Sequence, residues 1–263
     1  MPSDKPIIWA AAAAVVVGGA VFYYYYHTAS TETPAAAAVH PAVLPPAEPE
    51  PAIKHPVPAA NTVAAAPLPT LADSDAAIHS ALTGVSGAAA LEKFLVPQNI
   101  VRHIVVTVDN LPRKKVALEL RPLKPTPGHL VTAGTADEMT LSAQNAARYA
   151  PFVDLVRSTP TRDLVAQYYH FYPLFQQAYE NLGYPTQYFN DRVIEVIDDL
   201  LMTPDVKGPI GLTQPNVMYQ YADPRLEALS AGQKTLLRMG PENEAALKVK
   251  LHELRDALAA RKP

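Results

Sequence analysis

An uncharged apolar run followed by a proline- and alanine-rich tract constrains this chain more than any other feature. Residues 7–26 read IIWAAAAAVVVGGAVFYYYY. At about 1.5 Å per residue, a helix of this length spans roughly 30 Å, the thickness of a hydrocarbon core. Trp9 lies near one end and Tyr23–Tyr26 at the other, where membrane interfaces favour such rings. The run predicts a transmembrane anchor over residues 7–27 after a short N-terminal tail, residues 1–6.

A cleaved signal peptide is the alternative for this run. It would need an apolar region of about 7–15 residues and small residues at the cleavage site. Here the run is longer and ends in tyrosines and His27, so we expect an anchor that is retained. Lys5 precedes the run and no Lys or Arg follows before Lys54, although Asp4 weakens this asymmetry. The positive-inside rule therefore predicts a cytoplasmic N-terminus, with the bulk of the chain across the membrane.

Residues 28–70 form a linker by composition, since they hold ten prolines and thirteen alanines and few large apolar side chains. Proline fixes φ and removes a donor, and such a segment buries too little surface to offset its ordering entropy. We predict a disordered, partly polyproline-II spacer that reaches roughly 130 Å at about 3.1 Å per residue. A ligand for a polyproline-binding domain is the alternative.

Residues 71–263 are long enough to form a single folded domain with an ample core. They carry 20 Lys and Arg against 21 Asp and Glu, so nucleic acid is not expected as a partner. The chain has no cysteine, which excludes disulfides, thiol nucleophiles and cysteine-ligated metals. No cofactor and no metal are expected.

The hydrophobic pattern predicts a mainly α fold with a small antiparallel β element (α+β). Ile100, Val101, Ile104, Val105 and Val108 follow one helical face starting after Pro97, which favours a helix over 100–108, although the β-branched run leaves a strand open. Alternating residues from Val116 and a turn at Gly134 predict the β element within 116–141. The remaining expectations are helices over 142–157, 161–181, 190–202 (capped by Asn190), 230–240 (capped by Ser230) and 241–260, and extended structure or a small hairpin within 209–222.

Five segments are similar in order and spacing to one bacterial family. They are VVTVDNLPR (105–113), RPLKPTPG (121–128), YPLFQQAYENLGYP (172–185), YFNDRVIEVIDDLL (188–201) and MYQYADPRLEALSAGQKTLLRMGPEN (218–243). On these segments the chain resembles domain of unknown function 3014. The resemblance implies bacterial origin, and members also carry an N-terminal membrane segment and a Pro/Ala-rich linker. With the charge asymmetry, it places the protein in the inner membrane, single-pass, with the C-terminal domain in the periplasm. The resemblance implies no activity and carries over no functional residue.

Two helical faces and the histidines contain the side chains that could bind a ligand or a metal or act as acid and base. An aromatic stripe follows one helix face and is expected to pack the core, with sugar or peptide binding as the alternative; it comprises Tyr168, Tyr172, Phe175 and Tyr179. An acidic face is expected to be solvated, with acid/base chemistry as the alternative; it comprises Asp191, Glu195, Asp198 and Asp199. The histidines form no motif with metal-ligand spacing. No catalytic residue is therefore assigned, and an enzyme is less expected than a binding protein.

Polar residues beside helix breakers are the candidates for a binding surface. Helix caps, turns and ion pairs explain each of them equally well. The candidates are Asp109, Asn110, Arg113, Tyr172, Asn190, Asp191, Arg192, Gln214, Tyr221 and Asp223. The expected function is a membrane-tethered periplasmic adaptor that binds an envelope protein or a cell-wall polymer. The alternatives are an envelope hydrolase that uses carboxylates of the 190–199 helix and a cytoplasmic-facing membrane regulator.

Overall fold

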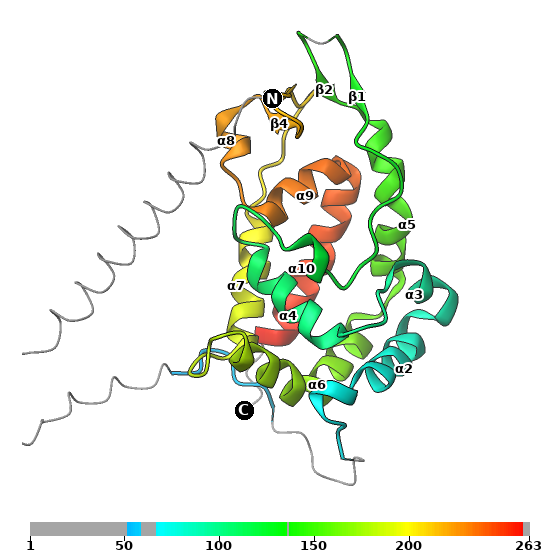
Figure 1. The fold of residues 1–263 in the computed structure, drawn as a ribbon, viewed down its shortest axis with the longest axis vertical. Coiled ribbons are helices and arrows are strands. Elements are labelled where there is room, and N and C mark those ends of the chain that lie inside the picture. Colours follow the sequence, from blue (N-terminus) through cyan, green and yellow to red (C-terminus); the bar gives the residue numbers. More distant parts are fainter. Residues whose placement is uncertain (1–51, 59–66, 136, 260–263) are drawn as a thin grey trace, which may run out of the picture. The chain divides into compact units, whose positions relative to one another are not determined.

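Helices make up most of residues 52–58, 67–135 and 137–259, the part of the chain that the computed structural model describes (Figure 1). The elements are η1 (Leu71–Asp73), α2 (Asp75–Ser86), α3 (Ala88–Phe94), α4 (Ile100–Asn110), η2 (Leu118–Leu120), β1 (Thr132–Ala133), β2 (Thr140–Leu141), α5 (Gln144–Ser158), α6 (Thr161–Asn181), α7 (Phe189–Leu201), β3 (Leu212–Thr213), β4 (Gln220–Tyr221), α8 (Pro224–Glu227), α9 (Ala231–Met239) and α10 (Pro241–Ala259). The predicted anchor over 7–27 lies outside these residues. Among the helices that are described, none combines the length and the apolar character needed to cross a membrane.

The helix predicted over 100–108 is confirmed as α4. Val101 and Val105 lie one turn apart and are both buried, so the helical period outweighs the β-branched composition. The helix begins at Ile100 and not directly after Pro97. The carboxylate of Asp75, on α2, accepts hydrogen bonds from the amides of Asn99 (2.7 Å) and Ile100 (2.8 Å) and so satisfies the start of α4.

The predicted antiparallel β element is confirmed in part. Strands β1 and β2 pair around the Gly134 turn, and β3 pairs with β4 within residues 209–222. The two hairpins meet through backbone hydrogen bonds: Leu141 N–H donates to the Ile210 carbonyl and Leu212 N–H to the Met139 carbonyl, both at 2.8 Å. The strand expected from Val116 is wrong, because Leu118–Leu120 is a 3-10 turn with exposed leucines. A strand also needs a second strand to pair with its backbone, and the alternation of side chains does not supply one.

The C-terminal half follows the predicted helices closely. Ser230 caps α9 through a capping box with Gln233, as expected. Asn190 does not cap α7, because the helix already begins at Phe189. Its side chain lies inside the first turn and is used for tertiary contacts instead. Helix α10 packs against both α5 and α7 in the middle of the domain (Figure 1).

Two apolar clusters meet at helix α6. The first lies between α2, α3, α4 and α6, and the second lies between α6, α7 and α10. Tyr168 on α6 and Val193 on α7 pack against both clusters. The aromatic stripe belongs to this core as expected, with Phe175 and Tyr179 buried and Tyr168 and Tyr172 half-buried. The two clusters do not close completely against each other, and a cavity remains between them.

The link between α9 and α10 requires glycine. Gly240 has φ 85° and ψ 158°, a region that other residues enter only with strain, and an added Cβ would lie 3.1 Å from Ala146 Cβ. Gly240→Ala is therefore expected to lower the free energy of unfolding by about 1–3 kcal/mol. Urea unfolding followed by circular dichroism measures it. Gly84→Ala, where nothing lies within 4 Å of the added Cβ, is the control and should stabilise by about 0.5–1 kcal/mol. Equal effects at both positions would contradict this account.

Candidate functional site

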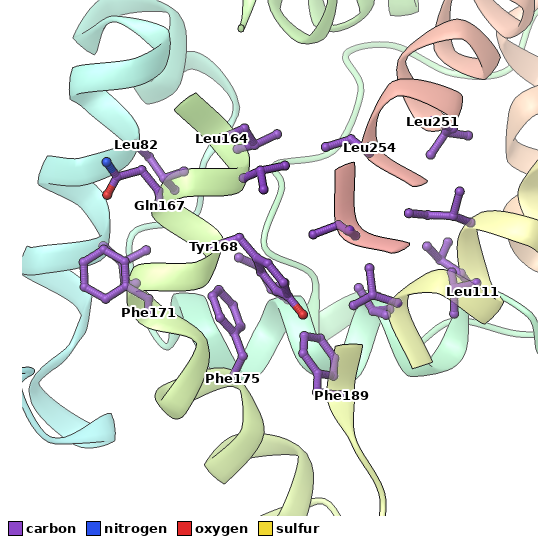
Figure 2. A pocket seen from close by; sticks show the side chains of 18 of the residues that line it. Leu82, Leu111, Leu164, Gln167, Tyr168, Phe171, Phe175, Phe189, Leu251 and Leu254 are labelled. Atoms are coloured by element: carbon purple, nitrogen blue, oxygen red, sulfur yellow. The ribbon is translucent and has the colours of Figure 1, made fainter. Parts of the chain in front are cut away.

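A cavity of about 320 Å³ lies where the two apolar clusters meet (Figure 2). We call it the five-helix cavity, because side chains from α2, α4, α6, α7 and α10 line it together with one residue that follows α4. Its lining residues are Ile78, Ala81, Leu82, Ile104, Val108, Leu111, Leu164, Val165, Gln167, Tyr168, Phe171, Phe175, Phe189, Val193, Val196, Ile197, Leu200, Leu251, Leu254 and Leu258.

The surface of the five-helix cavity is apolar throughout. Figure 2 shows Leu164 and Leu254 on one side of the space and Phe175 and Phe189 on another. Several aliphatic liners, Leu82 among them, are only half-buried, so the cavity opens toward solvent. A polar ligand would lose its hydrogen bonds to water here, whereas an alkyl chain would lose none. The walls therefore select a hydrocarbon.

Tyr168 carries the one hydroxyl group in the wall. This hydroxyl donates to Asn190 Oδ1 at 3.2 Å and is thereby satisfied outside the cavity. Burial raises the pKa of Tyr168 well above its ordinary value, with smaller contributions from Tyr172, Tyr169 and Asp191. The phenol therefore stays protonated at neutral pH and remains a donor. Through its hydrogen bond to Asn190, Tyr168 links the cavity wall to the first turn of α7.

The start of α7 holds a segment without regular secondary structure, residues 52–58, which bends at Lys54 and His55. The carboxylate of Asp191 accepts hydrogen bonds from the backbone amides of Lys54 (3.0 Å) and His55 (2.7 Å). Asn190, which is 1% exposed, donates from Nδ2 to the His55 carbonyl at 2.8 Å. We call these three contacts the clasp. Each contact is made to a backbone atom of the segment, so the clasp does not depend on the side chains of Lys54 and His55.

The clasp lies within residues that the sequence predicts as linker. Residues 52–58 belong to the range 28–70, yet here they contact the folded domain. Farther along, Leu68 packs on the first apolar cluster. The rest of the predicted range up to residue 66 lies outside the described residues. Because Asn190 bonds both Tyr168 and His55, one side chain connects the cavity wall with the clasp.

Three predicted candidates form a second group at the end of α4. Asp109 is 3% exposed and pairs with Arg113 at 2.5 Å and with Arg192 at 3.2 Å. Arg192 also donates to the Asp109 carbonyl at 2.8 Å, and it pairs with Glu195 at 2.9 Å. Tyr184 closes the group by accepting from Arg113 at 2.9 Å. The carboxylate is fully used by neighbouring side chains, and its role is to tie α4 to α7.

Of the remaining candidates, only Tyr172 lies beside the clasp, where Asn190 and Asp191 both act on its hydroxyl. Asn110 donates to the Val106 carbonyl of its own helix at 2.6 Å. The hydroxyl of Tyr172 donates to Gln176 at 3.0 Å, and burial raises its pKa to about 12. The other three lie on the β3–β4 hairpin and beside α8, away from the clasp; they are Gln214, Tyr221 and Asp223. A single surface uniting all ten candidates is therefore not formed.

The acidic face of α7 offers no paired carboxylates. Asp191 accepts the clasp amides, and Glu195 pairs with Arg192 and is 67% exposed. Asp198 pairs with Arg255, and Asp199 accepts from the Ser230 hydroxyl at 2.8 Å. Glu195 and Asp198, whose side chain is 44% exposed, fit the expected solvated face, although each also forms an ion pair. Across the described ranges, no group of three His, Cys, Asp or Glu side chains is arranged to hold a metal ion.

Sequence reasoning missed the cavity and half of the clasp. The cavity liners are ordinary aliphatic residues, which read as core in any helical domain. The partners of Asp191 are two backbone amides, and backbone amides leave no signal in a sequence. No residue type in 52–58 marks this segment as one that contacts the domain.

Comparison with known proteins supports one family. A family model described as "Protein of unknown function (DUF3014)" matches residues 100–255, which cover α4 through most of α10. No curated protein and no solved structure matches the chain. The match spans more than half of the chain and includes the segments that form the cavity walls from α4, α6 and α7.

Proposed function

The chain belongs to the DUF3014 family, and we propose that it is a membrane-tethered binding domain of the bacterial envelope that takes the aliphatic chain of a lipid into the five-helix cavity. The observation that carries the proposal is the cavity itself, which combines a ligand-sized volume with walls that expose no polar surface. Binding of a partner protein or a cell-wall polymer stays a prediction.

Size and chemistry favour an aliphatic chain over a peptide. A helix with its side chains is about 10–12 Å across, too wide for a space of about 320 Å³. An extended peptide would bring amide groups that these walls cannot satisfy, at a cost of several kcal/mol. Each methylene that leaves water contributes about 0.8 kcal/mol, so a chain of several methylenes gains enough to bind.

The predicted anchor would keep the cavity beside a source of acyl chains. With residues 52–58 held by the clasp, the free spacer after the predicted anchor shortens to residues 28–51. At about 3.1 Å per residue this segment reaches roughly 75 Å, little more than half the reach of the whole predicted linker. A topology reporter fused after Pro263 that is active only in the periplasm supports this orientation. A reporter active only in the cytoplasm overturns it.

Filling the cavity should abolish ligand capture. Ala81 lines the cavity from α2, and Ala81→Phe places a ring in the space that the chain would occupy. With the full protein in membranes that contain a photoreactive fatty acid, we expect crosslinking to fall by about tenfold or more, because displacing two methylenes already costs about 1.6 kcal/mol. Mass spectrometry of the labelled peptides measures the change and the position of the label.

The matched control is Ala76→Phe, on the same helix but exposed, which should leave the labelling unchanged. Labels on peptides from α6 and α10 in the unaltered protein support the proposal. Labelling that is absent there, or that is equal in the two phenylalanine variants, refutes it. Far-UV circular dichroism establishes that both variants are folded.

A further inference from the structure

A second, smaller cleft lies between the β3–β4 hairpin and helices α5 and α9. Its volume is about 210 Å³, and its wall mixes polar and apolar side chains. We call it the hairpin cleft. Its lining residues include Arg148 and Tyr149 from α5, Arg238 from α9, and Leu212, Met218 and Tyr221 from the hairpin. The five-helix cavity shares none of these residues, so the hairpin cleft is independent of the proposed function.

Two guanidinium groups line the hairpin cleft without an acidic partner. Among the described residues, neither Arg148 nor Arg238 forms an ion pair with a carboxylate. Arg148 donates to the carbonyls of Pro127 (3.0 Å) and Gly128 (2.8 Å) and to Asn145 Oδ1 (3.0 Å), all of them neutral. These bonds fix the position of the charge and do not neutralise it.

Glu227, an acid on which Arg238 acts, is already occupied. Glu227 pairs with Lys234, one turn before Arg238 on α9, at 2.9 Å, and it also accepts from the Tyr221 amide at 2.9 Å. Arg238 lies over the ring of Tyr221, with its guanidinium carbon 6.0 Å from the centroid. Arg148, Lys234 and Arg238 together exceed the single carboxylate of Glu227 by two positive charges. An anion in the hairpin cleft would balance this excess.

The remaining wall is suited to an apolar group. The guanidinium of Arg148 lies over the ring of Tyr149 at 5.7 Å, and this ring and Leu212 line the space. Met218, also in the wall, is 73% exposed, and its neighbour Val217 at the hairpin tip is 86% exposed. These two side chains place apolar surface beside the cleft.

We propose that the hairpin cleft binds a small ligand that carries an oxyanion, a carboxylate or a phosphate, on an apolar body. Arg238 and Arg148 hold the oxyanion, because the planar fork of arginine matches these groups with charge-assisted hydrogen bonds. Met218 and Tyr149 contact the apolar body. Half-buried cations without an acid gain most from such a ligand, since their charge is only partly solvated.

Saturation-transfer NMR tests this proposal on the full protein in lipid nanodiscs, with empty discs as the blank. The probes are benzoate, phenyl phosphate, inorganic phosphate and benzyl alcohol. We expect an anionic aromatic probe to bind more tightly than both benzyl alcohol and inorganic phosphate. Arg238→Gln should weaken its binding by about tenfold or more, the loss expected of one charge-assisted hydrogen bond.

Arg225→Gln is the matched control, because Arg225 is 90% exposed on the neighbouring α8 and pairs with Asp223. It should change the affinity less than twofold. Met218→Ser, at an exposed position, keeps the test informative if Arg238→Gln does not fold: it should weaken benzoate and leave inorganic phosphate unchanged. No binding of either anionic aromatic probe at about 10 mM overturns the proposal. Equal affinities in the Arg238→Gln and Arg225→Gln variants, or equal binding of benzyl alcohol, also overturn it.

Discussion

Replacing Asp109 with asparagine is expected to lower the free energy of unfolding by about 3 kcal/mol, the cost of removing one partner from a buried ion pair. Asp109 is 3% exposed and receives Arg192, whose side chain is 16% exposed, at 3.2 Å. Asparagine keeps the shape but removes the charge, so Arg192 stays largely buried with only the exposed Glu195 to balance it. Urea unfolding of residues 50–263, the compact unit, followed by circular dichroism, measures the loss.

An exposed ion pair provides the control for this loss. Asp154 and Arg157 are 4.0 Å apart with both side chains mostly exposed, so Asp154→Asn should cost less than about 0.5 kcal/mol. A similar small loss for Asp109→Asn would show that the pair does not hold α4 to α7. The account of the second group of candidates would then be wrong.

Removing the Asp191 carboxylate is expected to release the clasp. The full protein in nanodiscs is digested briefly with trypsin, and cleavage after Lys54 is followed by mass spectrometry. In the unaltered protein this bond is protected, because its own N–H, that of His55, and the preceding N–H, that of Lys54, both donate to the Asp191 carboxylate. Asp191→Ala removes both charge-assisted hydrogen bonds, each contributing about 1.5–3 kcal/mol. Cleavage governed by the open population should then be about 100-fold faster.

Asp198→Asn is the control for the clasp. It removes the same charge from α7, but Asp198 pairs with Arg255 and does not contact residues 52–58 in the clasp. It should leave cleavage after Lys54 at the rate of the unaltered protein. Equal rates for Asp191→Ala and the unaltered protein would show that residues 52–58 do not depend on this carboxylate. The spacer would then have its full predicted length.

Local rules in the sequence were sufficient for α4 to α7, α9 and α10, whereas α2, α3 and α8 were not predicted. Ser230 with Gln233 marks the start of α9, and the buried period of Val101 and Val105 identifies α4. The same rules failed at Leu118–Leu120, because alternation describes one strand and says nothing of a partner. The cap predicted at Asn190 was wrong for a related reason. An asparagine that can cap a helix can equally form a buried tertiary contact, and only the fold decides between the two.

The candidate site was less accessible to sequence reasoning than the fold. A cavity is a property of how helices meet, and its aliphatic liners have the composition of any packed core. The clasp pairs a carboxylate with backbone amides of a tract whose composition predicts no contact at all. Asp109, Arg113 and Arg192 were predicted as candidates, but spacing along the chain does not show that Arg192 pairs with Asp109 across two helices.

The central claim is that the five-helix cavity takes an aliphatic chain, and one measurement tests it directly. Residues 50–263 would be crystallised with a terminally brominated fatty acid, and the anomalous signal of bromine would locate the end of the chain. We predict a peak within the space bounded by Leu164, Leu254 and Phe189. A peak at another place would contradict the claim. The absence of a peak, in a structure where these three side chains pack directly against each other, would also contradict it.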